Sequence, residues 1–207
     1  LPVTNRLGKL EGIIVTKDIA TSYMDVYDSR VLSKARTLYK NIAETLDGKV
    51  IAGNEHAYFV RGKVLIGAAD LEFMTEFIES DDCVILGSRK SAQIRAIEAN
   101  ASCIIIGCGF DVDDEVLEMA NKKDCVVITT PYDTFSVARL INQSMPIKEF
   151  MTKENLITFQ IDDYVDDVKE TMSKIRHRDF PIVDVSGNYI GMVSRRNLMS
   201  MQKKQVI

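Results

Sequence analysis

The stretch FPIVDVSGNYIGMVSRRNL at residues 180–198 repeats, without a gap, the pattern of LPVTNRLGKLEGIIVTKDI at residues 1–19. The turn glycines Gly8 and Gly187 align, and apolar residues fall on apolar residues at the strand positions expected to be buried. An internal duplication of this kind constrains the fold before residue propensities are considered. Each copy predicts strand, turn, strand and then a helix, which begins near Thr16 in the first copy.

The second copy is preceded by a further strand and helix that the first copy lacks. The strand is expected at residues 155–159, and Asp162-Asp163 is expected to cap the helix that follows. That helix is predicted from an apolar stripe at helical spacing, formed by Val165, Val168, Met172 and Ile175. The first copy therefore begins halfway through its own domain, and we expect the chain to be a fragment of a longer protein.

Residues 25–145, between the copies, follow a different pattern. An apolar stripe over residues 31–46 predicts one helix, which Gly48 stops. Short strands are expected at residues 49–52, 56–60 and 63–66, and the last two are predicted to form a hairpin.

Farther along, helices are expected near residues 70–79, 90–100 and 113–123, and they alternate with strands. The strands are the continuous apolar segments Cys83-Val84-Ile85-Leu86, Cys103-Ile104-Ile105-Ile106 and Cys125-Val126-Val127-Ile128. Strands that are apolar on both faces belong in a parallel sheet covered on both sides. The predicted fold class is therefore α/β, with α+β repeats on either side.

Composition and charge narrow the classes of function. The chain has 207 residues, 46% hydrophobic residues and a net charge of −4, which argues against non-specific nucleic-acid binding. No apolar run is long enough to span a bilayer, and the first residues do not open a signal peptide. We interpret the cysteines as buried small hydrophobes of a cytoplasmic protein: Cys83, Cys103, Cys108 and Cys125.

The end of the second copy carries groups suited to a phosphate and a ribose. A helix N-terminus presents free N–H groups and a positive dipole end, and the Ser194 hydroxyl adds a donor for phosphate. Asn197 offers donors and acceptors for ribose hydroxyls. The basic cluster Arg176-His177-Arg178 can form charge-assisted bonds to phosphate, together with Arg196. The alternative is that Ser194 and Asn197 only cap the helix and that the basic cluster is a solvated helix end.

The repeated unit resembles the CBS domain, through its Pro-hydrophobic strand, Gly turn and Gly-h-h-(Ser/Thr)-x-x-(Asp/Asn) close, with h an apolar residue. The second copy has this close intact at residues 191–197. The resemblance implies a Bateman-type module of paired repeats that senses adenine nucleotides. It places the adenine among two short segments of the second copy, Leu156-Ile157-Thr158 and Phe180-Pro181-Ile182.

The first copy departs from this close. Val15 stands at the Ser/Thr position and Thr16 follows it, whereas Asp18 matches the family pattern. Lys17 is expected to supply a cation near the phosphate.

The middle region resembles the DRTGG domain, although its two name-giving motifs are degenerate. Gly87-Ser88-Arg89 and Gly107-Cys108-Gly109 stand at the motif positions, and Thr130–Phe135 matches the family's Pro-Tyr-Asp-Thr stretch. The first of these motifs is either a phosphate cradle before a helix or a capped turn.

The order of modules is similar to the regulatory region of nucleotide-regulated family II inorganic pyrophosphatases. The expected boundaries are residues 1–24 for the first, incomplete CBS domain, 25–145 for the DRTGG domain and 146–207 for the second CBS domain. The resemblance implies a homodimer that AMP and ADP inhibit and that ATP or diadenosine polyphosphates, such as diadenosine tetraphosphate, activate. It also implies that manganese or cobalt belongs only to a catalytic domain outside this sequence, which residues 203–207 would lead into.

Other functions remain open from the sequence. No catalytic motif is present: the two histidines, His56 and His177, lack ligand spacing, and the acidic clusters at residues 111–115 and 162–167 fit helix starts better than metal sites. The chain is alternatively an interaction or dimerisation module whose nucleotide site is vestigial. It is also alternatively the sensor part of a transcription regulator, although it lacks a basic helix-turn-helix.

Overall fold

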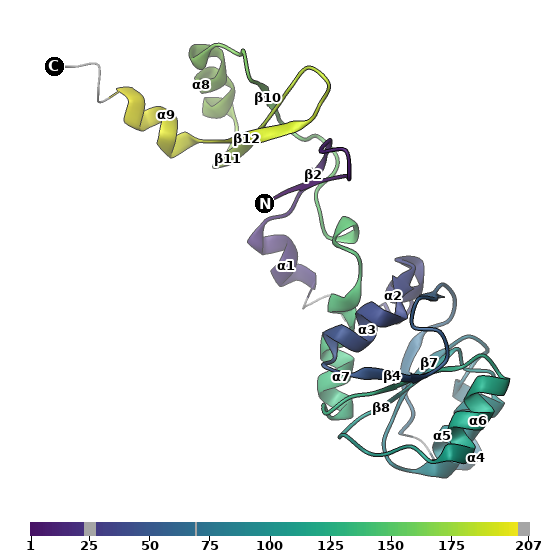
Figure 1. The fold of residues 1–207 in the computed structure, drawn as a ribbon. Coiled ribbons are helices and arrows are strands. Elements are labelled where there is room, and N and C mark those ends of the chain that lie inside the picture. Colours follow the sequence, from purple (N-terminus) through teal and green to yellow (C-terminus); the bar gives the residue numbers. More distant parts are fainter. Residues whose placement is uncertain (23–27, 69, 203–207) are drawn as a thin grey trace. The chain divides into compact units, whose positions relative to one another are not determined.

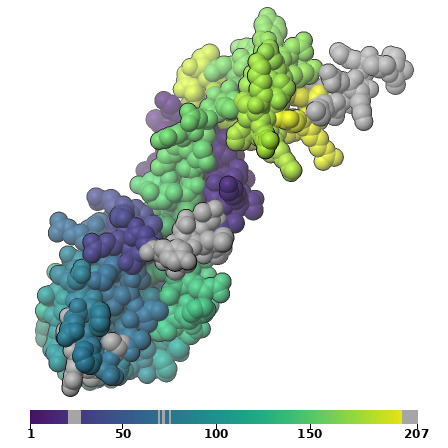
Figure 2. All heavy atoms as spheres, turned by 180° about the vertical axis from the view of Figure 1, so that it is seen from behind, coloured from purple at the N-terminus to yellow at the C-terminus, as the bar shows by residue number. Residues whose placement is uncertain are grey.

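The computed structural model describes residues 1–22, 28–68 and 70–202, and the chain forms two compact units. Unit 1 combines Leu1–Asp18 with Phe150–Ile207, and unit 2 is Ile19–Glu149. Figures 1 and 2 colour unit 2 blue to teal-green, and the two parts of unit 1 purple and green to yellow. Residues 203–207, which were expected to lead into a catalytic domain, lie outside the described part of the chain.

Unit 2 is built on a five-stranded sheet in the order β4-β9-β8-β7-β6 (Figure 1). Its strands are β4 (Lys49–Ala52), β9 (Val126–Thr129), β8 (Cys103–Ile106), β7 (Cys83–Leu86) and β6 (Val64–Ile66). Neighbouring strands run parallel, except that β4 is antiparallel to β9. The residues of β7 and β8 are all buried, which confirms the predicted α/β class with a covered parallel sheet.

Helices cover both faces of this sheet (Figure 1). One core is formed with α4 (Leu71–Phe77), α5 (Lys90–Glu98) and α6 (Asp114–Lys122). The other is formed with α2 (Val31–Lys34), α3 (Tyr39–Thr45), α7 (Thr134–Leu140) and the 3-10 helix η1 (Ile141–Ser144). A second 3-10 helix, η2 (Ile147–Glu149), ends the unit. Side chains alternate along each strand between the two cores, so both faces must be apolar.

The predicted single helix over residues 31–46 is wrong. The chain breaks at Arg36, which has a left-handed φ of 53° and separates α2 from α3. Between the helices, β3 (Thr37–Leu38) pairs with β5 (Tyr58–Phe59). The hydroxyl of Thr37 donates to the Leu32 carbonyl oxygen at 2.9 Å, which satisfies a carbonyl that a continuous helix would have bonded internally.

The predicted hairpin over residues 56–66 is also wrong. The first of its strands, β5, pairs with β3, whereas the second, β6, joins the parallel sheet beside β7. The turn at Gly62 has a φ of 86°, and a Cβ there would collide with the backbone of Asp81. The glycine therefore allows a close approach to the sheet and does not close a two-stranded ribbon.

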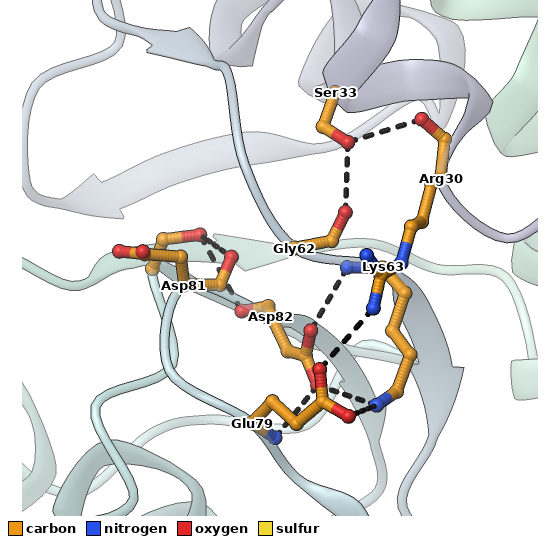
Figure 3. A network of polar contacts seen from close by, with 8 residues as sticks. Arg30, Ser33, Gly62, Lys63, Glu79, Asp81 and Asp82 are labelled. Atoms are coloured by element: carbon orange, nitrogen blue, oxygen red, sulfur yellow. Dashed lines mark hydrogen bonds and ion pairs between the residues drawn. The ribbon is translucent and has the colours of Figure 1, made fainter.

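Buried polar groups fix the amino end of β7 (Figure 3). The carboxylate of Asp82, whose side chain is fully buried, accepts hydrogen bonds from the backbone N–H groups of Lys63 and Glu79, both at 2.8 Å. The Lys63 ammonium lies 3.5 Å from Asp82 and 3.0 Å from Glu79. The network joins the start of β6, the segment after α4 and the start of β7.

Three of the four cysteines are buried, as predicted, but the interpretation of Cys108 as a buried hydrophobe is wrong. Cys108 is exposed in the loop after β8, with a φ of 63°. Its N–H group donates to Tyr132 and that of Gly109 to Thr130, so backbone bonds to the loop after β9 hold this conformation.

Unit 1 contains both copies of the repeat. The first copy supplies β1 (Pro2–Thr4), β2 (Leu10–Ile13) and the start of α1 (Thr16–Ser22). The second copy supplies β10 (Phe159–Gln160), α8 (Val165–Lys174), β11 (Asp179–Val183), β12 (Tyr189–Ser194) and α9 (Arg195–Gln202). Its core consists of Phe159, Val168, Met172, Phe180 and Leu198.

The strand and the helix cap that were expected before the second copy form differently. Only Phe159 of the predicted strand is in β10, because Asn155 has a left-handed φ of 54° and the chain bends there. The N-cap residue of α8 is Tyr164 and not Asp162 or Asp163. Asp163 instead accepts a hydrogen bond from the Gln160 N–H at 2.7 Å and closes the turn before the helix.

The two copies meet through their turns. The N–H of Leu10 donates to the Gly187 carbonyl at 3.1 Å, and the N–H of Tyr189 donates to the Gly8 carbonyl at 2.9 Å. Leu10 and Tyr189 are equivalent positions of the repeat, as are Gly8 and Gly187, and both glycines have a φ of 82°. The hairpins are therefore related by an approximate twofold symmetry.

Candidate ligand-binding site

A pocket of about 270 Å³ lies within unit 1, where the end of the first copy meets the segment that leads into the second. It is lined by Ile13, Val15, Thr152, Glu154, Asn155, Leu156, Ile157, His177, Asp179 and Phe180. The volume lies just below the range of about 300–1,000 Å³ that is usual for small-molecule sites, so the pocket has room for no more than one small ligand.

Backbone bonds join the two segments that form the pocket. The N–H of Ile13 donates to the Thr152 carbonyl at 3.0 Å, and the N–H of Thr152 donates back to Ile13 at 2.8 Å. A Cβ on Gly12 would lie 2.7 Å from the Met151 sulfur and 2.8 Å from the Thr152 oxygen. Glycine is therefore needed at position 12 for the segment to approach β2 so closely.

The pocket combines an apolar wall with polar groups. Phe180 is almost fully buried, and its ring packs against Phe159 at 5.4 Å and edge-to-face with His177 at 6.1 Å. Ile157 packs against the same core. Among the lining residues His177 and Asp179 are exposed, and they contribute an imidazole and a carboxylate. Such a site suits a flat apolar group that carries polar substituents.

Four residues predicted for the site line this pocket: Leu156, Ile157, His177 and Phe180. Five further residues predicted for the site lie within two positions of these residues in the sequence but do not line the pocket: Arg176, Arg178, Thr158, Pro181 and Ile182. Arg176 and Arg178 are exposed, whereas Pro181 is buried in β11.

The closing motif of the first copy, at residues 12–18, includes one end of the pocket lining and continues beyond it. Val15 lines it, and the exposed Thr16 and Lys17 begin α1. The carboxylate of Asp18 accepts a hydrogen bond from the Val15 N–H at 2.8 Å. In this structure Asp18 therefore caps the start of α1.

The close of the second copy is not part of the pocket lining. The Ser194 hydroxyl oxygen accepts a hydrogen bond from the Asn197 N–H at 3.1 Å, so Ser194 caps α9, and Arg196 and Asn197 are exposed. The residue that sequence reasoning missed here is Arg195. Its guanidinium donates to the carbonyls of Met172 and Ile175 at the end of α8, where a cation is favourable.

Several further lining residues were not predicted from the sequence: Ile13, Val15, Thr152, Glu154, Asn155 and Asp179. The repeat pattern contained the information needed to find these residues. The two copies are related by an approximate twofold symmetry, and the end of the second strand of the first copy faces the segment that precedes the second copy.

The Thr130–Phe135 stretch of unit 2 has a structural role. The Asp133 carboxylate accepts hydrogen bonds from the N–H groups of Phe135 and Ser136, both at 2.9 Å, and caps α7. These bonds, with that from the Ser136 hydroxyl, lower the pKa of Asp133. The Thr130 hydroxyl donates to the Leu46 carbonyl at 2.5 Å and ties the loop after β9 to the end of α3.

Within the described residues no three His, Cys, Asp or Glu side chains gather as a metal site would require. The helices of the described part of the chain include none that is long and apolar enough to cross a bilayer.

Unit 1 is a module of paired repeats that contains a pocket, and unit 2 is a parallel α/β domain. The model of the DRTGG domain matches residues 41–144, and the model of the CBS domain matches residues 147–204. The chain belongs to the family of CBS–DRTGG regulatory regions.

Two curated relatives match the chain over all 207 residues. One is the "Cobalt-dependent inorganic pyrophosphatase" of Clostridium perfringens, at 39% identity, and the other is the "Probable manganese-dependent inorganic pyrophosphatase" of Thermotoga maritima, at 29% identity. The chain spans 38% and 37% of their lengths.

A solved structure is similar over nearly the whole chain. It contains the CBS and DRTGG domains of the regulatory region of Clostridium perfringens pyrophosphatase, complexed with its activator, diadenosine tetraphosphate. The TM-score is 0.89 at 38% identity, over 94% of this chain and 85% of that one.

Proposed function

We propose that the unit 1 pocket binds an adenine nucleotide, and that this binding regulates an inorganic pyrophosphatase of which the region is a part. The observation that carries the proposal is the pocket between the two repeats, which has an apolar wall beside an exposed basic cluster. The diadenosine tetraphosphate bound by the related regulatory region supports adenine as the base.

In this proposal the base lies against Leu156-Ile157 and Phe180, because these supply an apolar wall next to backbone hydrogen-bonding groups. The phosphate lies toward the cations of Arg176-His177-Arg178 and toward Thr16 and Lys17. Asp18 bonds the ribose after releasing the Val15 N–H. Thr158, Pro181 and Ile182 support the wall from behind, and Ser194, Arg196 and Asn197 belong to a second, symmetry-related nucleotide site.

We infer the direction of regulation from the resemblance to nucleotide-regulated family II inorganic pyrophosphatases. AMP and ADP inhibit, ATP and diadenosine polyphosphates activate, and the regulatory region forms a homodimer. Opposite effects at one site require that the ligands prefer different subunit arrangements, because equal affinity for both would shift nothing. A tenfold preference supplies about 1.4 kcal/mol. Manganese or cobalt acts in the catalytic domain and not in this region.

Isothermal titration calorimetry of the 207-residue chain with AMP, ADP, ATP and diadenosine tetraphosphate tests the proposal. We expect His177→Ala to weaken binding by about 1–2 kcal/mol, roughly tenfold, because it removes a pocket wall and a phosphate partner. His56→Ala is the matched control, since His56 is an exposed histidine of unit 2 that does not line the pocket, and its loss should leave the affinity unchanged. Asn197→Ala tests the proposed second site separately, because Asn197 does not line this pocket.

An absence of heat with every adenine nucleotide at millimolar concentration would reject nucleotide binding and favour a module that only mediates dimerisation. Loss of binding in Asn197→Ala, with wild-type affinity in His177→Ala, would move the site to the second close.

A further inference from the structure

A second pocket, of about 450 Å³, lies entirely within unit 2. The lining residues are Tyr39, Gly53, Asn54, Ala57, Tyr58, Val60, Arg61, Asp81, Ser102, Asp124 and Val126. Asp81, Ser102 and Asp124 stand just before β7, β8 and β9, so this pocket is at the amino ends of the parallel strands. It is separate from the DRTGG-like motifs, which follow the carboxyl ends of the strands.

The walls of this pocket are held in place by the fold. The Tyr39 ring is buried and packs against Phe59 at 6.2 Å. The Ser102 hydroxyl donates to the Asp81 carbonyl at 2.7 Å. A Cβ on Gly53 would lie 2.9 Å from the Cα of Val126, so the loop over the pocket sits directly against the sheet.

The lining of this pocket carries more negative than positive charge. Within the described residues neither carboxylate, of Asp81 or of Asp124, forms an ion pair or accepts a hydrogen bond. The nearby Lys63 pairs instead with Glu79 and Asp82, and no line in Figure 3 reaches the Asp81 carboxylate. Arg61 is the only cation in the lining, so the pocket has a net negative charge.

Apolar surface lies beside these carboxylates. Tyr58 is 54% exposed and Val60 is 47% exposed, although both line the pocket. An aromatic face and an aliphatic side chain next to carboxylates suit a cation on an apolar stem, since the ring attracts the charge and the stem covers apolar area.

We propose that this pocket binds an organic cation, either an alkylammonium or a guanidinium group. The charged group lies at the carboxylates of Asp81 and Asp124, and its aliphatic stem lies along Tyr58 and Val60. Two sources have this chemistry: a free polyamine, and a lysine or arginine side chain of a basic peptide. The site is independent of the nucleotide pocket in unit 1 and is not needed for the function proposed above.

Nuclear magnetic resonance titrations of the full chain at constant ionic strength test this assignment. The probes are spermidine, Nα-acetyl-lysine amide and Nα-acetyl-arginine amide, and the neutral control is Nα-acetyl-norleucine amide. We expect the cations, but not the control, to shift the backbone amides of residues 53–61, 102 and 124. A response to spermidine alone identifies a free polyamine as the ligand, and a response to the amides identifies a side chain.

Substitutions of the acidic and of the basic lining residues should change the affinity for the cation in opposite directions. Asp81→Asn with Asp124→Asn should weaken cation binding by about tenfold, whereas Arg61→Gln should tighten it by about twofold. The two aspartates have left-handed φ values of 72° and 55°, a region that asparagine also tolerates, so the backbone is preserved. Asp111→Asn is the control for loss of an exposed carboxylate outside the pocket.

Equal shifts with the norleucine control, no shifts with any cation at millimolar concentration, or unchanged affinity in the double variant would each overturn the proposal. The affinity for adenine nucleotides should remain at the wild-type value in all these variants, so a failure here is distinct from a failure of the nucleotide site.

Discussion

Gly12 and Gly191 occupy equivalent positions of the repeat but have different surroundings. A Cβ at Gly12 would collide with Met151 and Thr152, whereas a Cβ at Gly191 would meet no atom within 4 Å. We expect Gly12→Ala to destabilise the protein by about 1–3 kcal/mol and to weaken ligand binding, because the segment that forms the pocket must move. Gly191→Ala should be neutral or stabilising by up to about 1 kcal/mol.

Urea unfolding measures both glycine variants, and calorimetry measures their ligand binding. Equal stabilities for the two variants would contradict the packing described around Gly12.

The cysteines should differ sharply in reactivity. Burial raises the pKa of Cys103 well above its usual value and that of Cys125 to about 12, whereas Cys108 is exposed. A thiol reagent should therefore modify one cysteine in the native chain at neutral pH and all four after unfolding. Cys108→Ser should abolish the native reaction. Rapid native modification of a second cysteine would show that the sheet opens more readily than its burial implies.

The raised pKa of Cys125 also predicts how stability depends on pH. The unfolded thiol ionises near its usual pKa of 9.0, while the folded thiol stays protonated up to about 12. Its contribution to stability is therefore fully present below pH 9.0 and is lost as the pH rises toward 12. Cys125→Ala should flatten this alkaline decline, as urea midpoints measured across that range would detect.

At the scale of elements, Asp82 links three segments of unit 2 through its buried carboxylate. Asp82→Ala should destabilise the protein by about 2–4 kcal/mol, because two partly buried N–H groups would lose their acceptor and Lys63 would lose an ion-pair partner. Asp111→Ala removes an exposed carboxylate and should change stability by less than about 0.5 kcal/mol. Comparable chemical-denaturation midpoints for the two variants would refute the structural role of Asp82.

The sequence predicted the elements that have a strong apolar pattern. The strands β7, β8 and β9 and the helices between them lie where they were expected, because fully buried strands cannot be mistaken for surface segments. The segment 31–46 has helical spacing too, but Arg36 adopts a left-handed backbone and Thr37 joins a strand. Local periodicity does not reveal that β5, from a distant part of the sequence, offers a partner there.

The candidate site was predictable only in part. Residue types and the resemblance to the CBS domain together indicated Leu156, Ile157, His177 and Phe180, which line the pocket. Ser194 and Asn197 matched the motif equally well, yet a helix cap uses the same groups as a phosphate site. The sequence does not show which of the two closing motifs lies against another segment. This depends on tertiary contacts, such as the pairing of Ile13 with Thr152.

At the scale of the whole molecule, the two units should respond differently to ligand. A nucleotide at about a hundred times its Kd should stabilise the folded state by about 2.7 kcal/mol. We expect hydrogen exchange to slow mainly in unit 1, at residues 13–18, 152–157 and 177–180, which line or adjoin the pocket. Protection confined to unit 2 would contradict the assignment of the nucleotide to the pocket in unit 1.

The reciprocal bonds between the turns at Gly8 and Gly187 use main-chain atoms alone. Main-chain contacts impose few demands on side chains, so a duplicated unit joined in this way can keep its geometry while its two copies drift apart in chemistry. The two copies differ in this way, because one ends in Val-Thr-Lys-Asp and the other ends in Ser-Arg-Arg-Asn on a similar backbone. The same backbone arrangement therefore presents different chemical groups at its two equivalent helix starts.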